Sequence, residues 1–101
     1  MTGVVGTDLD GTYEWALTQT PPPTVCITGR TWAEYDDTAR TVAFAMPVYI
    51  RGEGRYGDRE HAGQFKAAMC DALNVTRFYE DDPLQAAIIR RLNMNVEVVL
   101  R

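Results

Sequence analysis

The interpretation of this sequence depends on one stretch, Val4-Val5-Gly6-Thr7-Asp8-Leu9-Asp10-Gly11-Thr12. Its first residues favour a short buried strand, and two aspartates follow where Gly11 lets the backbone turn. Two carboxylates in one loop repel each other unless a cation lies between them, and oxygen ligands favour a hard ion such as Mg²⁺. Because Asp-x-Asp-Gly is also typical of a surface β-hairpin, this stretch alone leaves both interpretations open.

Four more apolar runs rich in β-branched residues follow, and such runs are typical of strands buried on both faces. These further strands are expected over residues 24–29, 47–52, 75–80 and 96–100. The connection over 13–23 contains three consecutive prolines, so a loop is expected there.

Amphipathic patterns between the later runs predict helices, each with a capping signal at its start. They are expected over 31–45, with Thr31 and Glu34 as a capping box, from Asp58 to Asn74, and over 84–92 after Pro83. This alternation predicts an α/β fold, an open three-layer Rossmann-like sandwich with a mostly parallel five-stranded sheet.

Size and composition limit the function. The 101 residues predict a single domain over 1–101, with 46% hydrophobic and 24% charged residues. No apolar run approaches the roughly 18 residues of a membrane span, and the N-terminus does not resemble a secretory signal, so a cytoplasmic protein without membrane contact is expected. The net charge of −4 argues against a broad nucleic-acid surface. Cys26 and Cys70 lie in apolar patterns and are expected to be buried free thiols.

Polar residues gather where three of the expected strands end. These segments are Asp8 to Asp10, then Thr28-Gly29-Arg30, and then Glu80-Asp81-Asp82. Ligands of open α/β sheets bind beyond the carboxyl ends of the strands, so this pattern indicates a binding site there. A threonine that caps the next helix, or an aspartate that caps before Pro83, would explain single residues of the pattern equally well.

Asp8-Leu9-Asp10-Gly11-Thr12 resembles the DxDGT signature of the haloacid dehalogenase-like superfamily of phosphotransferases. The resemblance implies that Asp8 is the nucleophile and Asp10 the general acid/base. Thr28 followed by Gly29 resembles the second motif of the family, whose hydroxyl and following amide hold the phosphoryl oxygens.

The third family motif is a lysine that bridges nucleophile and phosphate, and the chain contains one lysine, Lys66. It lies in the middle of its expected helix, whereas the family pattern puts the lysine near the helix start. Glu80-Asp81-Asp82 resembles the fourth motif, an acidic pair that completes the metal site. The implied Mg²⁺ ligands are therefore Asp8, Asp10, Asp81 and Asp82, with Glu80 left at the strand end.

Glycines and arginines near these motifs are candidates for substrate binding. A backbone without a side chain can approach a phosphate closely, and guanidinium groups bind phosphate through two parallel hydrogen bonds. The expected substrate-binding residues are Gly11, Thr12, Gly29, Arg30, Arg51 and Arg55. The single histidine, His61, is expected to be an exposed helix residue, with contact to substrate as the alternative.

The resemblance implies a Mg²⁺-dependent phosphomonoester phosphatase that works through an aspartyl-phosphate. The chain has no room for the inserted cap domain of larger relatives, so an open site is expected. Such a site suits a large phosphorylated substrate, a polynucleotide end or a protein, or one enclosed by a second subunit of a homo-oligomer. The alternatives are a catalytically silent interaction or metal-binding module of the same fold, and a small acidic binding domain without phosphate chemistry.

Overall fold

The structure is a computed structural model that describes residues 3–101. Strands and helices alternate along the chain in the order β1 (Val4–Thr7), α1 (Tyr13–Ala16), β2 (Val25–Thr31), the 3₁₀ helix η1 (Trp32–Glu34), α2 (Asp37–Ala45), β3 (Val48–Gly52), α3 (Arg59–Ala72), β4 (Val75–Glu80), α4 (Pro83–Leu92) and β5 (Glu97–Leu100). No helix in residues 3–101 has the length and apolar character needed to cross a membrane.

The five strands form one sheet in the order β3-β2-β1-β4-β5, and every neighbouring pair is parallel. The predicted α/β class and five-stranded sheet are confirmed, and the sheet is wholly rather than mostly parallel. The chain moves outward from β1 to β2 and β3, and then crosses through α3 to β4 on the other side of β1. The strand order therefore reverses between β1 and β4, where such folds open a crevice for ligands.

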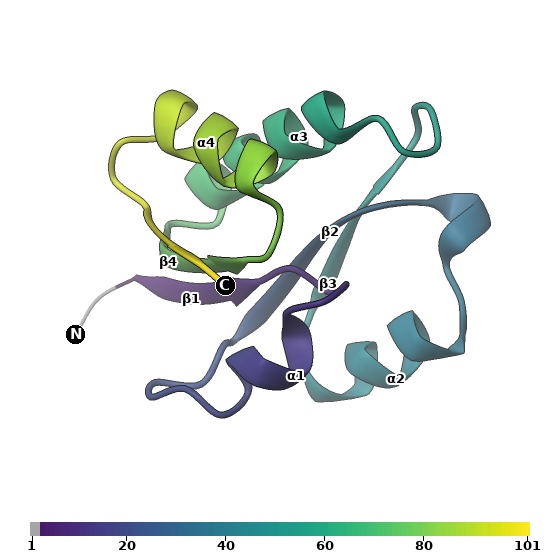
Figure 1. Cartoon of the computed structure of the whole chain (residues 1–101). Helices are drawn as coiled ribbons and strands as arrows, with labels where there is room; N and C mark the ends of the chain where they lie inside the picture. The colour runs from purple at the N-terminus through teal and green to yellow at the C-terminus, as the bar shows by residue number, and fades with distance from the viewer. Residues whose placement is uncertain (1–2) are drawn as a thin grey trace.

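Helices cover both faces of the sheet, which gives the three predicted layers (Figure 1). The α3 and α4 side holds the larger core, in which Ile27, Phe78 and Ile89 are fully buried. The other side packs the apolar residues of α2 and the following turn against Leu9 and Cys26. Both free cysteines are buried, as expected, and burial raises the pKa of the Cys70 thiol to about 12.

The helix expected over 31–45 is interrupted. The predicted capping box of Thr31 and Glu34 forms, but it begins only the 3₁₀ turn η1. Asp36 then adopts an extended conformation and caps α2 by accepting a hydrogen bond from the backbone N–H of Ala39. Arg30 stabilises the extended residues between η1 and α2, because its guanidinium donates to the Glu34 carbonyl and to the Asp36 carboxylate.

The connection from β1 to β2, expected to be a loop, contains the single helical turn α1. Its N-cap is Thr12, whose carbonyl accepts from the backbone N–H of Ala16. Ala16 is fully buried, and Trp15 packs edge-on against Tyr79 of β4 with ring centroids 5.4 Å apart. The turn therefore anchors the loop that carries the two aspartates against the sheet.

Candidate active site

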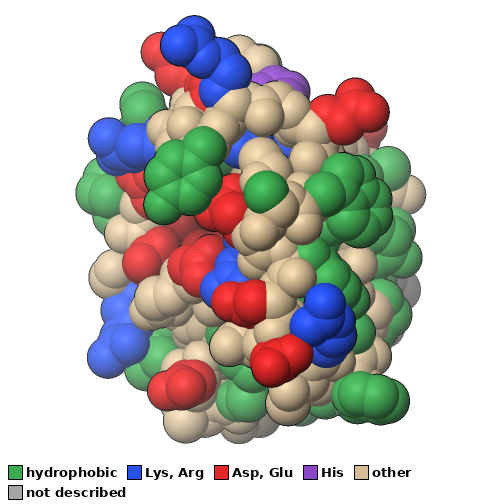
Figure 2. Space-filling view, turned by 90° about the vertical axis from the view of Figure 1, so that its right-hand side faces the viewer, with side chains coloured by type: hydrophobic (Ala, Val, Ile, Leu, Met, Phe, Trp, Pro, Cys, Tyr) green, Lys and Arg blue, Asp and Glu red, His purple; other side chains and the backbone are tan. Residues whose placement is uncertain are grey.

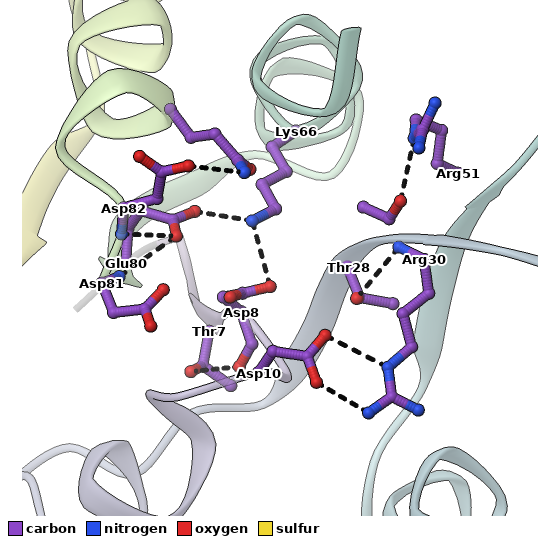
Figure 3. A network of polar contacts seen from close by, with 12 residues as sticks. Thr7, Asp8, Asp10, Thr28, Arg30, Arg51, Lys66, Glu80, Asp81 and Asp82 are labelled. Atoms are coloured by element: carbon purple, nitrogen blue, oxygen red, sulfur yellow. Dashed lines mark hydrogen bonds and ion pairs between the residues drawn. The ribbon is translucent and has the colours of Figure 1, made fainter. Parts of the chain in front are cut away.

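Asp8 and Glu80 meet at the point where the strand order reverses. Asp8 directly follows β1, Glu80 ends β4, and these two strands pair with Thr7 opposite Tyr79. Lys66 reaches between them from the middle of α3, with its Nζ 3.0 Å from Asp8 Oδ1 and 2.7 Å from Glu80 Oε1 (Figure 3). The exposed fractions of Asp8, Glu80 and Lys66 are 4%, 0% and 1%, so the bridge is almost fully buried.

The bridge contains two carboxylates for one ammonium, and burial makes that imbalance costly. Burial raises the pKa of Glu80 to about 7, against the opposing effect of Lys66. Burial likewise raises the pKa of Asp8, again opposed by the Lys66 ammonium. Burial alone would lower the pKa of Lys66, but the two carboxylates outweigh it and hold that pKa above its ordinary value. An added positive charge beside Asp8 would therefore favour its ionised form.

The residues present fit a divalent cation. Among residues 3–101, the carboxylates that converge are those of Asp8, Glu80 and Asp81, with one oxygen atom from each within 4.8 Å of the others. Gly11 makes room for the third of these, because a side chain at this left-handed position (φ 74°) would collide with the Asp81 carboxylate. Three carboxylates are the hard oxygen donors that Mg²⁺ prefers, so this cluster could hold the ion.

The side chain of Asp10 does not join this cluster, although the sequence predicted it as a ligand. Its two oxygen atoms accept from Nε and Nη2 of Arg30 at 3.1 and 2.7 Å, and its side chain is 60% exposed. Arg30 also binds Asp36 at 2.7 Å. The two hydrogen bonds turn the Asp10 carboxylate toward β2, which explains the difference from the predicted ligand set.

Asp82, the other predicted ligand outside the cluster, caps α4. Its carboxylate accepts from the backbone N–H of Leu84 and from the side chains of Arg59 and Gln85. The hydrogen bond from Arg59 holds the pKa of Asp82 well below its usual range. The interpretation of Asp82 as a helix cap is thus confirmed, and Glu80 takes the third place in the acidic cluster.

The predicted phosphate-binding residues Thr28 and Gly29 lie within β2, which continues to Thr31. Thr28 is fully buried, and its hydroxyl accepts from the backbone N–H of Arg30 at 3.3 Å. Gly29 lines the cavity next to Asp8 and packs against α3, where a Cβ atom on it would lie 2.6 Å from that of Ala62.

Arg51 lies near the end of β3 and Arg55 in the loop between β3 and α3, and the two have different surroundings. The Arg51 guanidinium donates to the carbonyls of Gly29, Glu53 and Arg55 and lies 2.9 Å from His61 Nδ1. Arg51 lines the cavity, but its guanidinium N–H groups already donate to these backbone carbonyls. Arg55 is exposed and does not line the cavity, and His61 contacts Arg51 from an exposed position on α3.

A cavity of about 300 Å³ opens over the cluster. Residues from six segments line it: Asp8, Asp10, Gly29, Arg30, Glu34, Arg51, Gly57, Asp58, Arg59, Ala62, Lys66, Asp81, Asp82 and Gln85. Figure 2 shows this face, where acidic side chains gather around a few basic ones and hydrophobic side chains lie on both sides. Gln85 carries a buried amide oxygen without a hydrogen-bond partner in the described residues. Sequence reasoning missed Gln85 and Arg59, because nothing in their local pattern distinguishes them from ordinary helix residues.

Comparison with known proteins gives one useful likeness. No family model and no curated protein matches the sequence. A chain in the structure of the Pnkp1/Rnl/Hen1 RNA repair complex superimposes with a TM-score of 0.65 and 16% sequence identity. The match covers 97% of this chain and 42% of that one, so this chain spans less than half the length of its structural neighbour. The likeness shows a shared fold.

Proposed function

We propose that this chain is a Mg²⁺-dependent phosphohydrolase of the haloacid dehalogenase-like type. The observation that carries the proposal is the buried bridge in which Lys66 holds Asp8 at the carboxyl edge of the sheet. A carboxylate that lines a cavity, held by one ammonium and flanked by two more carboxylates, suits attack on phosphorus better than it suits structural support. The resemblance of the four motifs points to the same chemistry.

In the proposed reaction a carboxylate oxygen of Asp8 attacks phosphorus, and the bond from phosphorus to the leaving oxygen breaks. Asp10 gives that oxygen a proton, and then takes a proton from the water that attacks the aspartyl-phosphate. The bond from phosphorus to Asp8 breaks, which releases phosphate and restores the carboxylate. Mg²⁺ held by Asp8 and Asp81 would supply positive charge to the phosphoryl oxygens, and the Lys66 ammonium would add to it.

Glu80 has a positioning role in this proposal. One of its oxygen atoms binds Lys66, and the other accepts from the backbone N–H groups of Asp81 and Asp82 at 3.1 Å each. It therefore fixes both the lysine and the start of the acidic loop. The Asp81 carboxylate accepts no hydrogen bond from a described residue, and the Lys66 ammonium pairs with Oδ1 of Asp8, so these two residues are the better ligands for the ion.

The first prediction tests the nucleophile. Asp8→Asn keeps the shape of the side chain but removes the attacking carboxylate, so hydrolysis of acetyl phosphate with Mg²⁺ should fall to the background rate. The measurement is phosphate release by wild type, Asp8→Asn and Asp37→Asn, each first shown to be folded by circular dichroism. Asp37 is an exposed residue of α2, so its variant should keep the wild-type rate. Turnover by Asp8→Asn near the wild-type rate would mean that another group attacks.

The Asp10–Arg30 ion pair favours a second candidate, a silent metal-binding module. Both oxygen atoms of the general acid/base are taken by one guanidinium, and turnover requires that at least one be released. A silent module would bind Mg²⁺ without hydrolysing any phosphomonoester. Arg30→Gln would free Asp10, and it should then raise turnover in an active enzyme whose rate is limited by this release.

A further inference from the structure

A second cavity of about 340 Å³ adjoins the site on the side of α1. Its walls combine aromatic rings, guanidinium groups and hydroxyls, and they are Leu9, Asp10, Gly11, Thr12, Tyr13, Glu14, Trp15, Arg30, Thr38 and Arg101. Asp10 and Arg30 also line the first cavity, so the two hollows share a wall. The proposed reaction puts the leaving oxygen beside Asp10, and the leaving group must therefore extend into space that Asp10 borders.

The aromatic side of this second cavity is held in place by contacts with neighbouring residues. Trp15 is held at 89° to the ring of Tyr79, which fixes its plane. The guanidinium of Arg101 lies 5.2 Å from the centre of the Trp15 ring, and it forms no ion pair with another residue of the described chain. A tryptophan with a free guanidinium on its ring offers both a stacking surface and a positive charge.

Thr12 gives an independent indication of a ligand. It is 1% exposed, and its hydroxyl oxygen has no hydrogen-bond partner in residues 3–101. A buried hydroxyl without a partner costs free energy, and a polar group of a ligand in the cavity would remove that cost.

We propose that the second cavity binds the nucleoside of a nucleoside phosphate whose phosphoryl group lies at Asp8. A planar base suits the Trp15 and Arg101 surface, and sugar hydroxyls suit Thr12 and Thr38. The volume lies within the usual range of small-molecule sites, about 300–1,000 Å³. A phosphopeptide fits less well, because its backbone offers no planar ring to stack on Trp15. The proposal rests on the proposed phosphatase function.

Trp15 itself can report binding, because the chain has two tryptophans and the other, Trp32, is 67% exposed on η1. In Trp32→Phe/Asp8→Asn protein, adenosine 5′-monophosphate, adenosine 3′-monophosphate or a 5′-phosphorylated trinucleotide should quench the remaining fluorescence to saturation. Inorganic phosphate and acetyl phosphate should not. Comparing the quenching by the two mononucleotides with that by the trinucleotide shows whether the cavity prefers a free nucleotide or the end of a strand.

Two substitutions locate the ligand. Arg101→Gln should raise the dissociation constant about tenfold, the scale expected for one stacking contact. Thr12→Val should raise it severalfold, whereas a hydroxyl without a ligand would leave it unchanged. Arg91→Gln is the matched control, since Arg91 lies at the other end of α4 from the site. Circular dichroism confirms that each variant is folded.

The outcomes separate this inference from the phosphatase proposal. Acetyl phosphate turnover without a saturable nucleotide response, or tighter binding of a phosphoserine peptide than of any nucleotide, overturns the nucleoside site alone. A nucleotide response that Arg101→Gln weakens supports the site. If the protein shows this response but hydrolyses no phosphomonoester, the nucleoside site is supported and the phosphatase proposal is overturned.

Discussion

Lys66 is a charged residue with only 1% of its surface exposed, and its ammonium forms ion pairs with two buried carboxylates. The sequence indicated this residue because it is the only lysine among ten basic side chains. The sequence did not indicate Glu80 as its partner. That contact depends on β1 and β4 being neighbours, and neighbours in a sheet come from the crossover through α3, which no local pattern encodes.

The second prediction concerns this lysine. Lys66→Met leaves two carboxylates buried without a counter-charge, which typically costs about 3–5 kcal/mol of stability. Turnover should fall about 10²–10³-fold, because the ammonium also faces the phosphoryl group in the proposed reaction. Adding Glu80→Gln should restore part of the stability but none of the activity. Urea unfolding and acetyl phosphate turnover of the two variants check this, and turnover of Lys66→Met within twofold of wild type would make the lysine structural.

Secondary structure elements were predicted well where the local signal is strong. The five strands, α3 and α4 begin and end close to the residues that the pattern indicated. The helix over 31–45 was wrong in its first half, because Asp36 is a second N-cap and Arg30 binds the extended residues before it. That contact from a neighbouring strand outweighs helical spacing, and it also leaves Trp32 exposed instead of on a buried face.

The third prediction concerns how closely α3 approaches β2. Gly29 and Ala62 are in contact there, and Lys66 lies one helical turn after Ala62. Gly29→Ala should push α3 outward, with a cost of about 1–3 kcal/mol and reduced turnover. Ala62→Gly alone should cost about 1 kcal/mol, the usual penalty for glycine within a helix.

The double variant tests whether a steric collision causes the loss of stability. If the two side chains collide, Gly29→Ala/Ala62→Gly should be clearly more stable than the sum of the single effects, and it should regain turnover. Urea midpoints and acetyl phosphate rates of the four proteins form the measurement. Additive losses would show that the glycine is needed for a local reason, such as its backbone conformation.

At the scale of the whole molecule, folding brings a surplus of buried negative charge to one edge of the sheet. Burial raises the pKa of Glu80 from 4.5 to about 7. A carboxyl whose pKa is higher in the folded state stabilises the fold below its unfolded pKa and loses that contribution as pH rises through the folded value. The metal-free protein should therefore lose stability as the pH rises from about 4.5 to about 7. Glu80→Gln should reduce this dependence of the unfolding free energy on pH.

The last prediction uses the same surplus to detect the ion. At pH 8, above the pKa of about 7 of Glu80, the negative charge around Lys66 is larger than in acid, so Mg²⁺ at Asp8 and Asp81 should add about 2.7 kcal/mol of stability at a hundredfold excess over its dissociation constant. The gain should be smaller at pH 5, where protons compete for the buried carboxyls. Urea midpoints with Mg²⁺ or EDTA at the two pH values measure it. Asp81→Ala should abolish the gain, and Asp71→Ala, on the exposed face of α3, should keep it. An equal gain in both variants would place the ion elsewhere.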